Sequence, residues 1–437
     1  MFHLKLGKAG GASVTRRNIK DYTILLPMML PIHFELIRQI ITDAGYRVEM
    51  MTNSGPGVVE EGLKYVHNDA CYPAILVIGQ VIESLKSGRY DTRHTAVAIT
   101  QTGGGCRASN YIFLLRKALK RAGFPEVPVI SLSFDLLKPS SPIPLTPGLL
   151  MRLAAAVLYG DYLMLLYNQT RSYEREPGVS KRVLDSWIDR LCREFRHSSL
   201  LGKAALGRTM AAIAADFAGV PAERTPKVKV GIVGEIYVKY AAFANNHLED
   251  FLVSQDCEVM VPGLMGFIQY CIVNKLEDYK LYGGSRAFCA LVKLVLRWLR
   301  RFEDAVTEAL KAYPGYTPST PFQEVVEMGR GVIGYGTKMG EGWLLTAEMT
   351  ELIHKGYGNI ICAQPFGCLP NHICGKGMIR ELRRRHPSAN IVAIDYDPGA
   401  TSVNQENRIK LMLAVAREAL SGTSQAAQPP EPLADAQ

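Results

Sequence analysis

Short apolar runs rich in β-branched residues alternate with longer amphipathic segments from residue 22 onward. In the first part of the chain the apolar runs predict strands at 23–26, 47–51, 96–100 and 127–131. The amphipathic segments predict helices at 31–44, 72–87 and 109–121, and the Ser54-Gly-Pro-Gly57 stretch predicts a loop. Strands separated by segments of helix length indicate βαβ units and a parallel sheet.

The pattern changes after a proline-rich stretch at 137–147. Three amphipathic segments, at 149–167, 183–195 and 204–217, then predict helices with no strand between them. Alternation returns near residue 227, with strands predicted at 228–233, 258–261, 359–363 and 391–395 and helices at 371–385 and 401–420. The last segment is rich in Ala, Gln and Pro and predicts disorder.

These patterns predict an α/β protein with two parallel-sheet domains and a helical insert between them. The expected divisions are an N-terminal extension at 1–21, a first α/β domain at 22–136, a helical linker at 137–226, a second α/β domain at 227–420 and a disordered tail at 421–437. A length of 437 residues is sufficient for two or three domains.

Composition and charge narrow the class of protein. Hydrophobic residues make up 48% of the chain, and 50 basic against 41 acidic residues give a net charge of +9. The basic clusters Arg297, Arg300, Arg301 and Arg380, Arg383, Arg384, Arg385 lie in helix-like stretches and are interpreted as solvated faces. No basic stripe interleaved with aromatic residues is present, so we expect no nucleic-acid partner.

The N-terminal segment shows no secretory pattern. Residues 1–20 contain basic side chains but no apolar core before a cleavage site, and the apolar run at 22–32 is too short to cross a bilayer. We therefore expect a soluble, cytoplasmic protein with no membrane partner. Nine cysteines in such a protein indicate core thiols, reactive thiols or metal ligands rather than a disulfide framework.

Three cysteines share a setting beside a predicted helix start. Cys71 lies in Asn68-Asp-Ala-Cys-Tyr-Pro73, Cys106 in Gln101-Thr-Gly-Gly-Gly-Cys106, and Cys368 in Gln364-Pro-Phe-Gly-Cys-Leu-Pro-Asn-His372. Ligands bind outside the carboxyl ends of parallel strands, and helix N-termini favour thiolates. The glycines preceding Cys106 and Cys368, Gly105 and Gly367, allow the backbone to approach a bulky ligand.

The alternative for each cysteine taken singly is a core thiol. The absence of any Cys-x-x-Cys disfavours a zinc ribbon and a thioredoxin-type redox pair, whereas three widely spaced thiolates suit an iron–sulfur cluster with one open iron. Cys362 and Cys374 remain as a possible neighbouring thiol or substitute ligand. Cys271 and Cys289 are predicted to be core residues, because they lie in apolar helical runs.

Other segments leave two interpretations open. The glycine-rich run 329–342 is neither a Walker A loop nor GxGxxG, and is either a flexible turn or a loop whose backbone approaches a ligand.

Asn371 and His372 can hydrogen-bond a cluster sulfur or a substrate. Asp395 and Asp397 either line a ligand-facing edge or cap the next helix. No Ser-His-Asp arrangement or GxSxG is present, and no catalytic residue is assigned.

The cysteine segments resemble the 2-hydroxyacyl-CoA dehydratase superfamily, in particular its acyl-CoA dehydratase activase-related branch. Gly231-Ile-Val-Gly-Glu-Ile-Tyr237, Asn245-Asn-His-Leu-Glu-Asp250 and Ile394-Asp-Tyr-Asp-Pro-Gly399 fit the same resemblance, which covers about 22–413. It implies flavodoxin-like or Rossmann-like domains with a [4Fe–4S] cluster, or a double-cubane form, in the cleft between them. Cys71, Cys106 and Cys368 would be the ligands, with Gly105, Gly367 and His372 contacting the cofactor.

The resemblance also implies an ATP-driven electron-transfer system. A separate ATP-hydrolysing activator of the actin/Hsp70-like fold would reduce the cluster, because this chain lacks the nucleotide-binding segments of that activator. A homodimer or a dimer with a related subunit is expected. The alternatives are a catalytic 2-hydroxyacyl-CoA dehydratase subunit, a double-cubane-type reductase of small substrates, a non-catalytic cluster scaffold, and a zinc site closed by His372.

Overall fold

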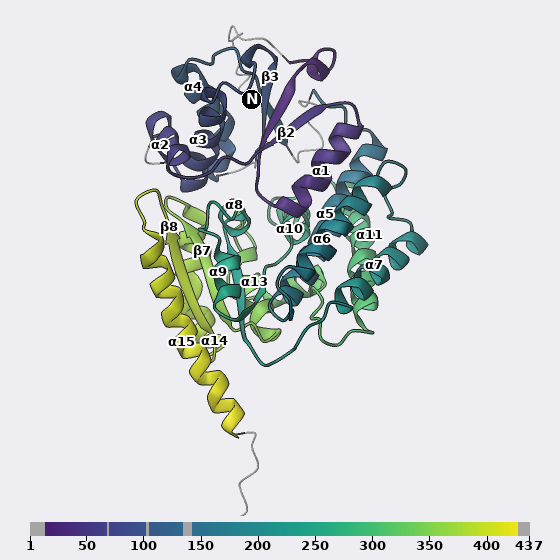
Figure 1. Ribbon diagram of the computed structural model, residues 1–437, viewed down its shortest axis with the longest axis vertical. Helices are drawn as coiled ribbons and strands as arrows, with labels where there is room; N and C mark the ends of the chain where they lie inside the picture. The colour runs from purple at the N-terminus through teal and green to yellow at the C-terminus, as the bar shows by residue number, and fades with distance from the viewer. Residues whose placement is uncertain (1–13, 68–69, 102–104, 134–141, 427–437) are drawn as a thin grey trace, which may run out of the picture.

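Two four-stranded parallel sheets organise the molecule. The computed structural model describes residues 14–67, 70–101, 105–133 and 142–426 (Figure 1). The first sheet has the order β2-β1-β3-β4, formed by β1 (Thr23–Pro27), β2 (Arg47–Met51), β3 (Thr95–Gln101) and β4 (Val129–Ser133). The second has the order β6-β5-β7-β8, formed by β5 (Val228–Gly234), β6 (Cys257–Met260), β7 (Asn359–Pro365) and β8 (Asn390–Tyr396).

The two sheets repeat one topology. In each, the first strand in sequence lies between the second and the third, and the fourth strand forms an edge. This is the beginning of the flavodoxin-like strand order. The predicted α/β class with two flavodoxin-like or Rossmann-like sheets is confirmed, and all eight predicted strands are present within two or three residues of their expected bounds.

The helices of the first sheet correct one prediction. They are α1 (Pro31–Asp43), α2 (Pro56–Tyr65), α3 (Tyr72–Lys86) and α4 (Tyr111–Ala122). The loop predicted around Ser54 to Gly57 is wrong beyond Gly55, because α2 begins at Pro56. Proline at the first helical position, preceded by Gly55 at a φ of 100°, is a helix start signal rather than a loop signal alone.

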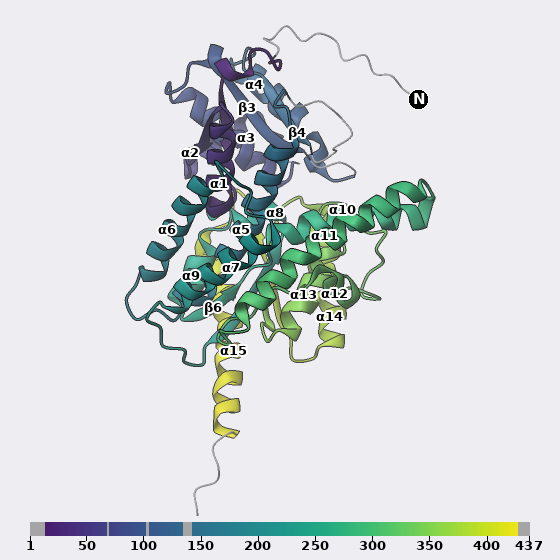
Figure 2. The ribbon, with the colours of Figure 1, turned by 90° about the vertical axis from the view of Figure 1, so that its right-hand side faces the viewer.

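Three helices without intervening strands connect the two sheets. They are α5 (Pro147–Arg171), α6 (Val179–Glu194) and α7 (Lys203–Ala218), as predicted. The central helix, α5, packs on α1, α6, α7 and β6 (Figures 1 and 2). Among the described residues α5 alone is long and apolar enough to cross a membrane, but 61% of its apolar window is buried inside the protein. This burial is what a core helix of a soluble protein requires.

The second sheet carries the remaining helices. They are α8 (Ile236–Tyr240), α9 (Leu248–Ser254), α10 (Leu264–Tyr282), α11 (Arg286–Leu310), α12 (Phe322–Met328), α13 (Leu344–His354), α14 (Ile379–Arg385) and α15 (Ser402–Ala426). The predicted helix at 371–385 is interrupted, since a π-helical turn (Asn371–Gly375) and a 3₁₀ turn (Lys376–Met378) precede α14. Helix α15 continues through Ala426, six residues into the segment predicted as disordered; residues 427–437 lie outside the described part.

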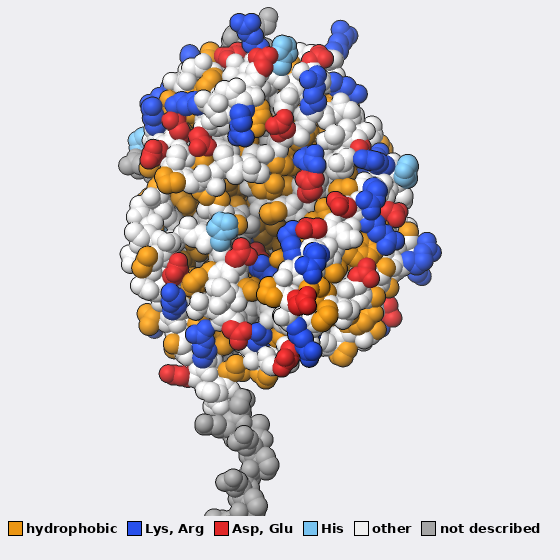
Figure 3. All heavy atoms as spheres, viewed as in Figure 1, with side chains coloured by type: hydrophobic (Ala, Val, Ile, Leu, Met, Phe, Trp, Pro, Cys, Tyr) orange, Lys and Arg blue, Asp and Glu red, His pale blue; other side chains and the backbone are white. Residues whose placement is uncertain are grey.

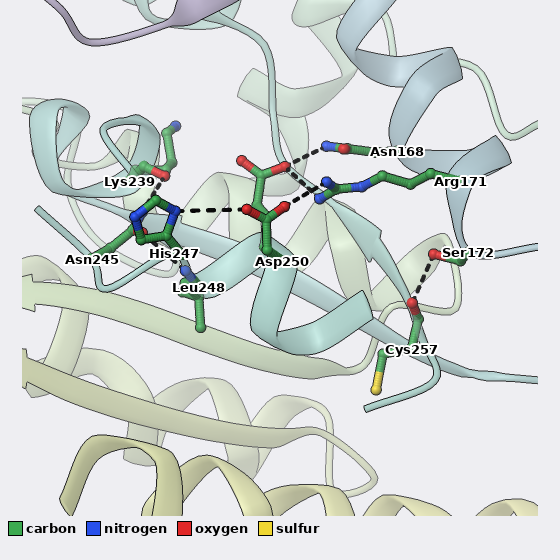
Figure 4. A network of polar contacts seen from close by, with 10 residues as sticks. Asn168, Arg171, Ser172, Lys239, Asn245, His247, Leu248, Asp250 and Cys257 are labelled. Carbon is green, nitrogen blue, oxygen red and sulfur yellow. Dashed lines mark hydrogen bonds and ion pairs between the residues drawn. The ribbon is translucent and has the colours of Figure 1, made fainter. Parts of the chain in front are cut away.

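A network of hydrogen bonds and ion pairs connects α9 to α5. The Asn245 carboxamide oxygen accepts the Leu248 N–H at 3.1 Å, and Arg171 of α5 pairs with the Asp250 carboxylate at 2.8 Å (Figure 4). Asn245 is buried. The segment 245–250, which carries part of the family resemblance, therefore has a role in holding the short helices that follow β5.

Candidate metal centre

The cysteine turns lie at related positions on the two sheets. Cys106 follows β3 and is the N-cap of a 3₁₀ turn (Arg107–Asn110), while Cys368 follows β7. In this strand order the topological switch point lies between β1 and β3 in one sheet and between β5 and β7 in the other, which is where ligands bind. Cys71 is the N-cap of α3, preceded by α2 rather than directly by a strand.

Direct backbone contacts join the Cys71 and Cys368 turns. The Tyr72 N–H donates to the Phe366 carbonyl at 3.0 Å. Gly367 has a φ of 72°, and a Cβ at this position would lie 3.3 Å from the Cys71 Cα and 3.2 Å from the Ala70 carbonyl oxygen. Only glycine combines this left-handed conformation with so close an approach. Gly367 thus holds the two turns against each other.

The glycine-rich segment 329–342 lies against Cys106. A Cβ at Gly340 would lie 3.8 Å from the Cys106 Sγ and 3.0 Å from the Pro370 ring, so this backbone lies between the Cys106 and Cys368 turns. The Gly105 N–H donates to the Met339 Sδ at 3.0 Å. Of the two interpretations open from the sequence, the contacts favour a loop whose backbone approaches the cysteines.

The local environment keeps the three thiols protonated. Cys71 is 5% exposed and shares a 2.8 Å hydrogen bond with the Tyr111 hydroxyl, and desolvation raises the pKa of its thiol. Desolvation also raises the pKa of Cys106 to about 11 and that of Cys368 far above its usual value. A bound metal cation would favour the deprotonated thiolates over the protonated thiols, because thiolates are the form that ligates metals.

Two carboxylates face the thiols. Glu235 follows β5 and caps α8, accepting the Val238 N–H at 2.9 Å, and the buried Glu341 accepts the Ile236 N–H at 2.9 Å. Desolvation and the charge of Glu341 raise the pKa of Glu235 to about 8, and desolvation raises the pKa of Glu341. Their charges in turn raise the pKa of the Cys106 and Cys368 thiols.

Sequence reasoning assigned no role to these carboxylates or to Tyr111. Glu235 had a usable signal, because it stands directly after the apolar strand run ending at Gly234, the same position that identified the cysteines. Glu341 sits in the glycine-rich run without a local pattern. Tyr111 begins α4 as an ordinary buried aromatic residue, and only the fold brings it to Cys71.

Asn371 and His372 take different positions after the Cys368 turn. The Asn371 Nδ2 donates to the Cys368 Sγ at 3.5 Å and to Glu341 at 3.4 Å, whereas its Oδ1 is buried without a hydrogen-bond partner. The exposed His372 ring instead lies 2.7 Å from the Gln364 Nε2. The structure therefore places the Asn371 side chain beside the sulfur and the His372 ring beside Gln364, and the cofactor contact of His372 stays a prediction.

The other candidate residues take structural positions. Asp395 pairs with Lys376 at 3.2 Å, and the Asp397 carboxylate accepts the Gly399 N–H at 2.7 Å.

Cys362 is fully buried in β7, and Cys374 is buried in the π-helical turn. All nine cysteines are free, as predicted. Residues 68–69 and 102–104 of the cysteine motifs lie outside the described part.

The donor set consists of three free thiols on separate turns. Across residues 14–67, 70–101, 105–133 and 142–426, no three His, Cys, Asp or Glu side chains form a group that could hold one metal ion. A cluster places a separate iron beside each thiolate, so its ligands stand further apart than those of one ion. Thiols on separate turns are the kind of donor that such a cluster requires.

The surface between the two sheet-bearing parts is hollowed on the face shown in Figure 3, and hydrophobic side chains gather around the hollow. Comparison of the chain with protein-family models and with curated proteins finds no match. The arrangement of the site is therefore the basis on which a function is proposed.

Proposed function

We propose that this protein holds a [4Fe–4S] cluster, or a double-cubane form of it, on Cys71, Cys106 and Cys368, and serves in an ATP-driven, low-potential electron-transfer system of the 2-hydroxyacyl-CoA dehydratase type. The observation that carries the proposal is the junction at Gly367, where the Tyr72 N–H donates to the Phe366 carbonyl at 3.0 Å and a Cβ added to Gly367 would lie 3.3 Å from the Cys71 Cα. Residues almost 300 positions apart in the sequence meet there with free thiols.

The surrounding residues support this role in three ways. At the helix and 3₁₀ starts, the backbone N–H groups of Ala74 and Ala108 lower the pKa of the Cys71 and Cys106 thiols and so offset part of the rise that desolvation causes. Tyr111 and Asn371 donate hydrogen bonds to the sulfurs of Cys71 and Cys368, respectively, when these are ligated as thiolates. The Glu235 and Glu341 carboxyl groups lie near the sulfurs and, when ionised, add negative charge, which lowers the potential of a cluster.

A bound cluster would supply one-electron transfer at low potential. The residues of this chain would bind it, exclude water with the buried Cys71 and Cys368 turns, and leave the less buried Cys106 side open. The electron donor would be the separate ATP-hydrolysing activator of the actin/Hsp70-like fold.

A zinc site closed by His372 is the weaker candidate. Tetrahedral Cys₃His coordination requires a His nitrogen directed at the metal. The His372 ring is exposed and bound to Gln364 instead.

The first test replaces one ligand and one matched control. Cys106→Ala is expected to lower iron content in anaerobically prepared protein to near zero, whereas Cys271→Ala in α10 is expected to leave it unchanged, because Cys271 has no contact with the three turns among those the structure gives. Iron and thermal unfolding are measured on both variants. Equal iron in the two stably folded variants would contradict the ligand assignment.

A further inference from the structure

Helices α10 and α11 form an arm that extends away from the rest of the protein. In Figure 2 the C-terminal end of α10 and the N-terminal end of α11 project beyond the second sheet and its helices. We define the arm as residues 279–301, with the turn at Gly283 and Gly284 at its tip. Beyond this region, the C-terminal half of α11 packs against α7.

The arm exposes an apolar stripe that nothing in the described chain covers. On α11 the stripe comprises Phe288, Leu291, Leu294 and Val295, which are 41%, 55%, 58% and 37% exposed. Spacings of three, three and one place these residues on one side of a helix. At the tip the stripe continues into Leu281 and Tyr282 of α10, which are 54% and 78% exposed.

A different side of α11 packs within the protein. Cys289, Val292 and Leu299 are buried, and α10 packs on α11. Taking 100° per residue, this buried side is centred roughly 100° from the exposed stripe, and Phe288 lies only about 20° from Leu299 around the helix. The exposed stripe therefore adjoins the buried side and widens the apolar face of α11 within the arm.

A basic flank borders the exposed stripe. Residues 279–301 contain six Lys or Arg and no Asp or Glu. Lys280 pairs with Glu277, and Arg300 with Asp304. The other four, Arg286, Lys293, Arg297 and Arg301, form no ion pair within the described residues. Spacings of seven and four between the first three align them along one side of α11.

We propose that the arm docks on an anionic lipid surface. An apolar helical face enters the boundary between headgroups and acyl chains, while adjacent Lys and Arg side chains meet the anionic headgroups. The exposed aromatic side chains of Tyr282 and Phe288 at the tip suit the same boundary. This docking is independent of the proposed cluster function. It differs from the sequence expectation of no membrane partner, which considered membrane-spanning segments.

A second copy of the chain fits the arm less well. Two arms pairing antiparallel through their stripes about a two-fold axis would bring both basic flanks to the same side of the pair. Like charges placed together disfavour that contact. An anionic partner surface has the complementary charge.

The test is sedimentation of the full-length protein with large phospholipid vesicles. We expect binding to vesicles of 70% phosphatidylcholine and 30% phosphatidylglycerol and none to pure phosphatidylcholine, with the bound fraction falling as salt rises. Lys293→Gln/Arg297→Gln is expected to weaken binding by about 30-fold, because each cation near such a surface contributes about a factor of five. Leu291→Glu/Leu294→Glu is expected to abolish binding.

The matched control is Lys117→Gln/Lys120→Gln, which removes two exposed cations from α4 and is expected to bind like the unchanged protein. Circular dichroism melting checks that the variants fold. Absence of binding to anionic vesicles, equal binding to both vesicle types, or equal weakening by the α4 control would overturn the proposal. So would loss of a dimer in light scattering for the Leu291→Glu/Leu294→Glu variant, because the arm would then be an interface between copies.

Discussion

At the residue scale, the lack of a side chain at Gly367 allows the Cys71 and Cys368 turns to lie in contact. Gly367 combines a φ of 72° with contacts to Ala70, Cys71 and Arg107, so any side chain there meets both a conformational and a steric obstacle. The cysteines supply the thiols. Because Cys71 and Cys368 are far apart in the sequence, the site depends on the close approach of their turns at Gly367.

We predict that Gly367→Ala lowers iron loading and destabilises the protein. The left-handed conformation of a non-glycine residue costs about 1–2 kcal/mol, and the added Cβ pushes the two turns apart. Iron per chain and the free energy of unfolding in urea are measured against Gly358→Ala, a glycine with nothing within 4 Å of the added Cβ. If Gly367→Ala loads as much iron as Gly358→Ala, the junction does not control the site.

The site residues were predictable only where a local pattern marks them. Cys71, Cys106 and Cys368 stand beside helix starts, and Gly105 and Gly367 precede two of them, so this shared setting marks them as candidate ligands. The Tyr111 hydroxyl and the Glu341 carboxylate reach the thiols through tertiary contacts that leave no sequence signal. His372 was predicted to contact the cofactor; its ring lies beside Gln364 and the Asn371 side chain lies beside the Cys368 sulfur, and the cofactor contact stays a prediction.

At the element scale, burial explains which segments the sequence predicts well. The strands of the second sheet are almost continuously buried, so they appear as apolar runs with clear ends. Helix α2 has only two buried residues, Val58 and Gly62, and its first residues fall in the Ser54–Gly57 stretch, whose Gly and Pro led to a loop prediction. The π-helical turn at Asn371–Gly375 keeps a helical pattern and cannot be distinguished from an α-helix by periodicity.

Helices α8 and α13 are joined by a buried ion pair. Lys239 and Glu348 are 2% and 3% exposed, and the Lys239 Nζ lies 3.4 Å from the Glu348 carboxylate. Desolvation raises the pKa of Glu348 to about 7, although the Lys239 charge opposes the rise. The desolvation of the carboxylate thus outweighs its attraction to one cation.

This pair predicts a pH dependence of stability. A carboxyl whose folded-state pKa is raised stabilises the fold below its unfolded pKa, near 4.5, and that stability is lost as pH rises through about 7. The free energy of unfolding of the unchanged protein, relative to Glu348→Gln, is therefore expected to fall by about 3 kcal/mol between pH 4.5 and pH 8. Urea unfolding across that range measures it. A difference that stays constant or grows with pH would show that Glu348 is charged throughout.

At the scale of the whole molecule, the two sheets repeat one strand order and place their switch points toward a shared site. Alternating strands and helices predicted both sheets, because parallel strands need crossover helices. The relative placement of the sheets was not predictable, since it depends on how α5 packs between α1, α7 and β6. That packing brings the Cys71 and Cys106 turns of one part onto the Cys368 turn of the other.

The most direct test of the central claim is the iron and acid-labile sulfide content of protein purified without oxygen, together with its EPR spectrum after reduction. A cubane on Cys71, Cys106 and Cys368 predicts about four iron and four sulfide per chain and a signal that appears on reduction, with proportionally more of both for a double-cubane form. Zinc in place of iron, or protein free of metal after strictly anaerobic preparation, would contradict the cluster assignment.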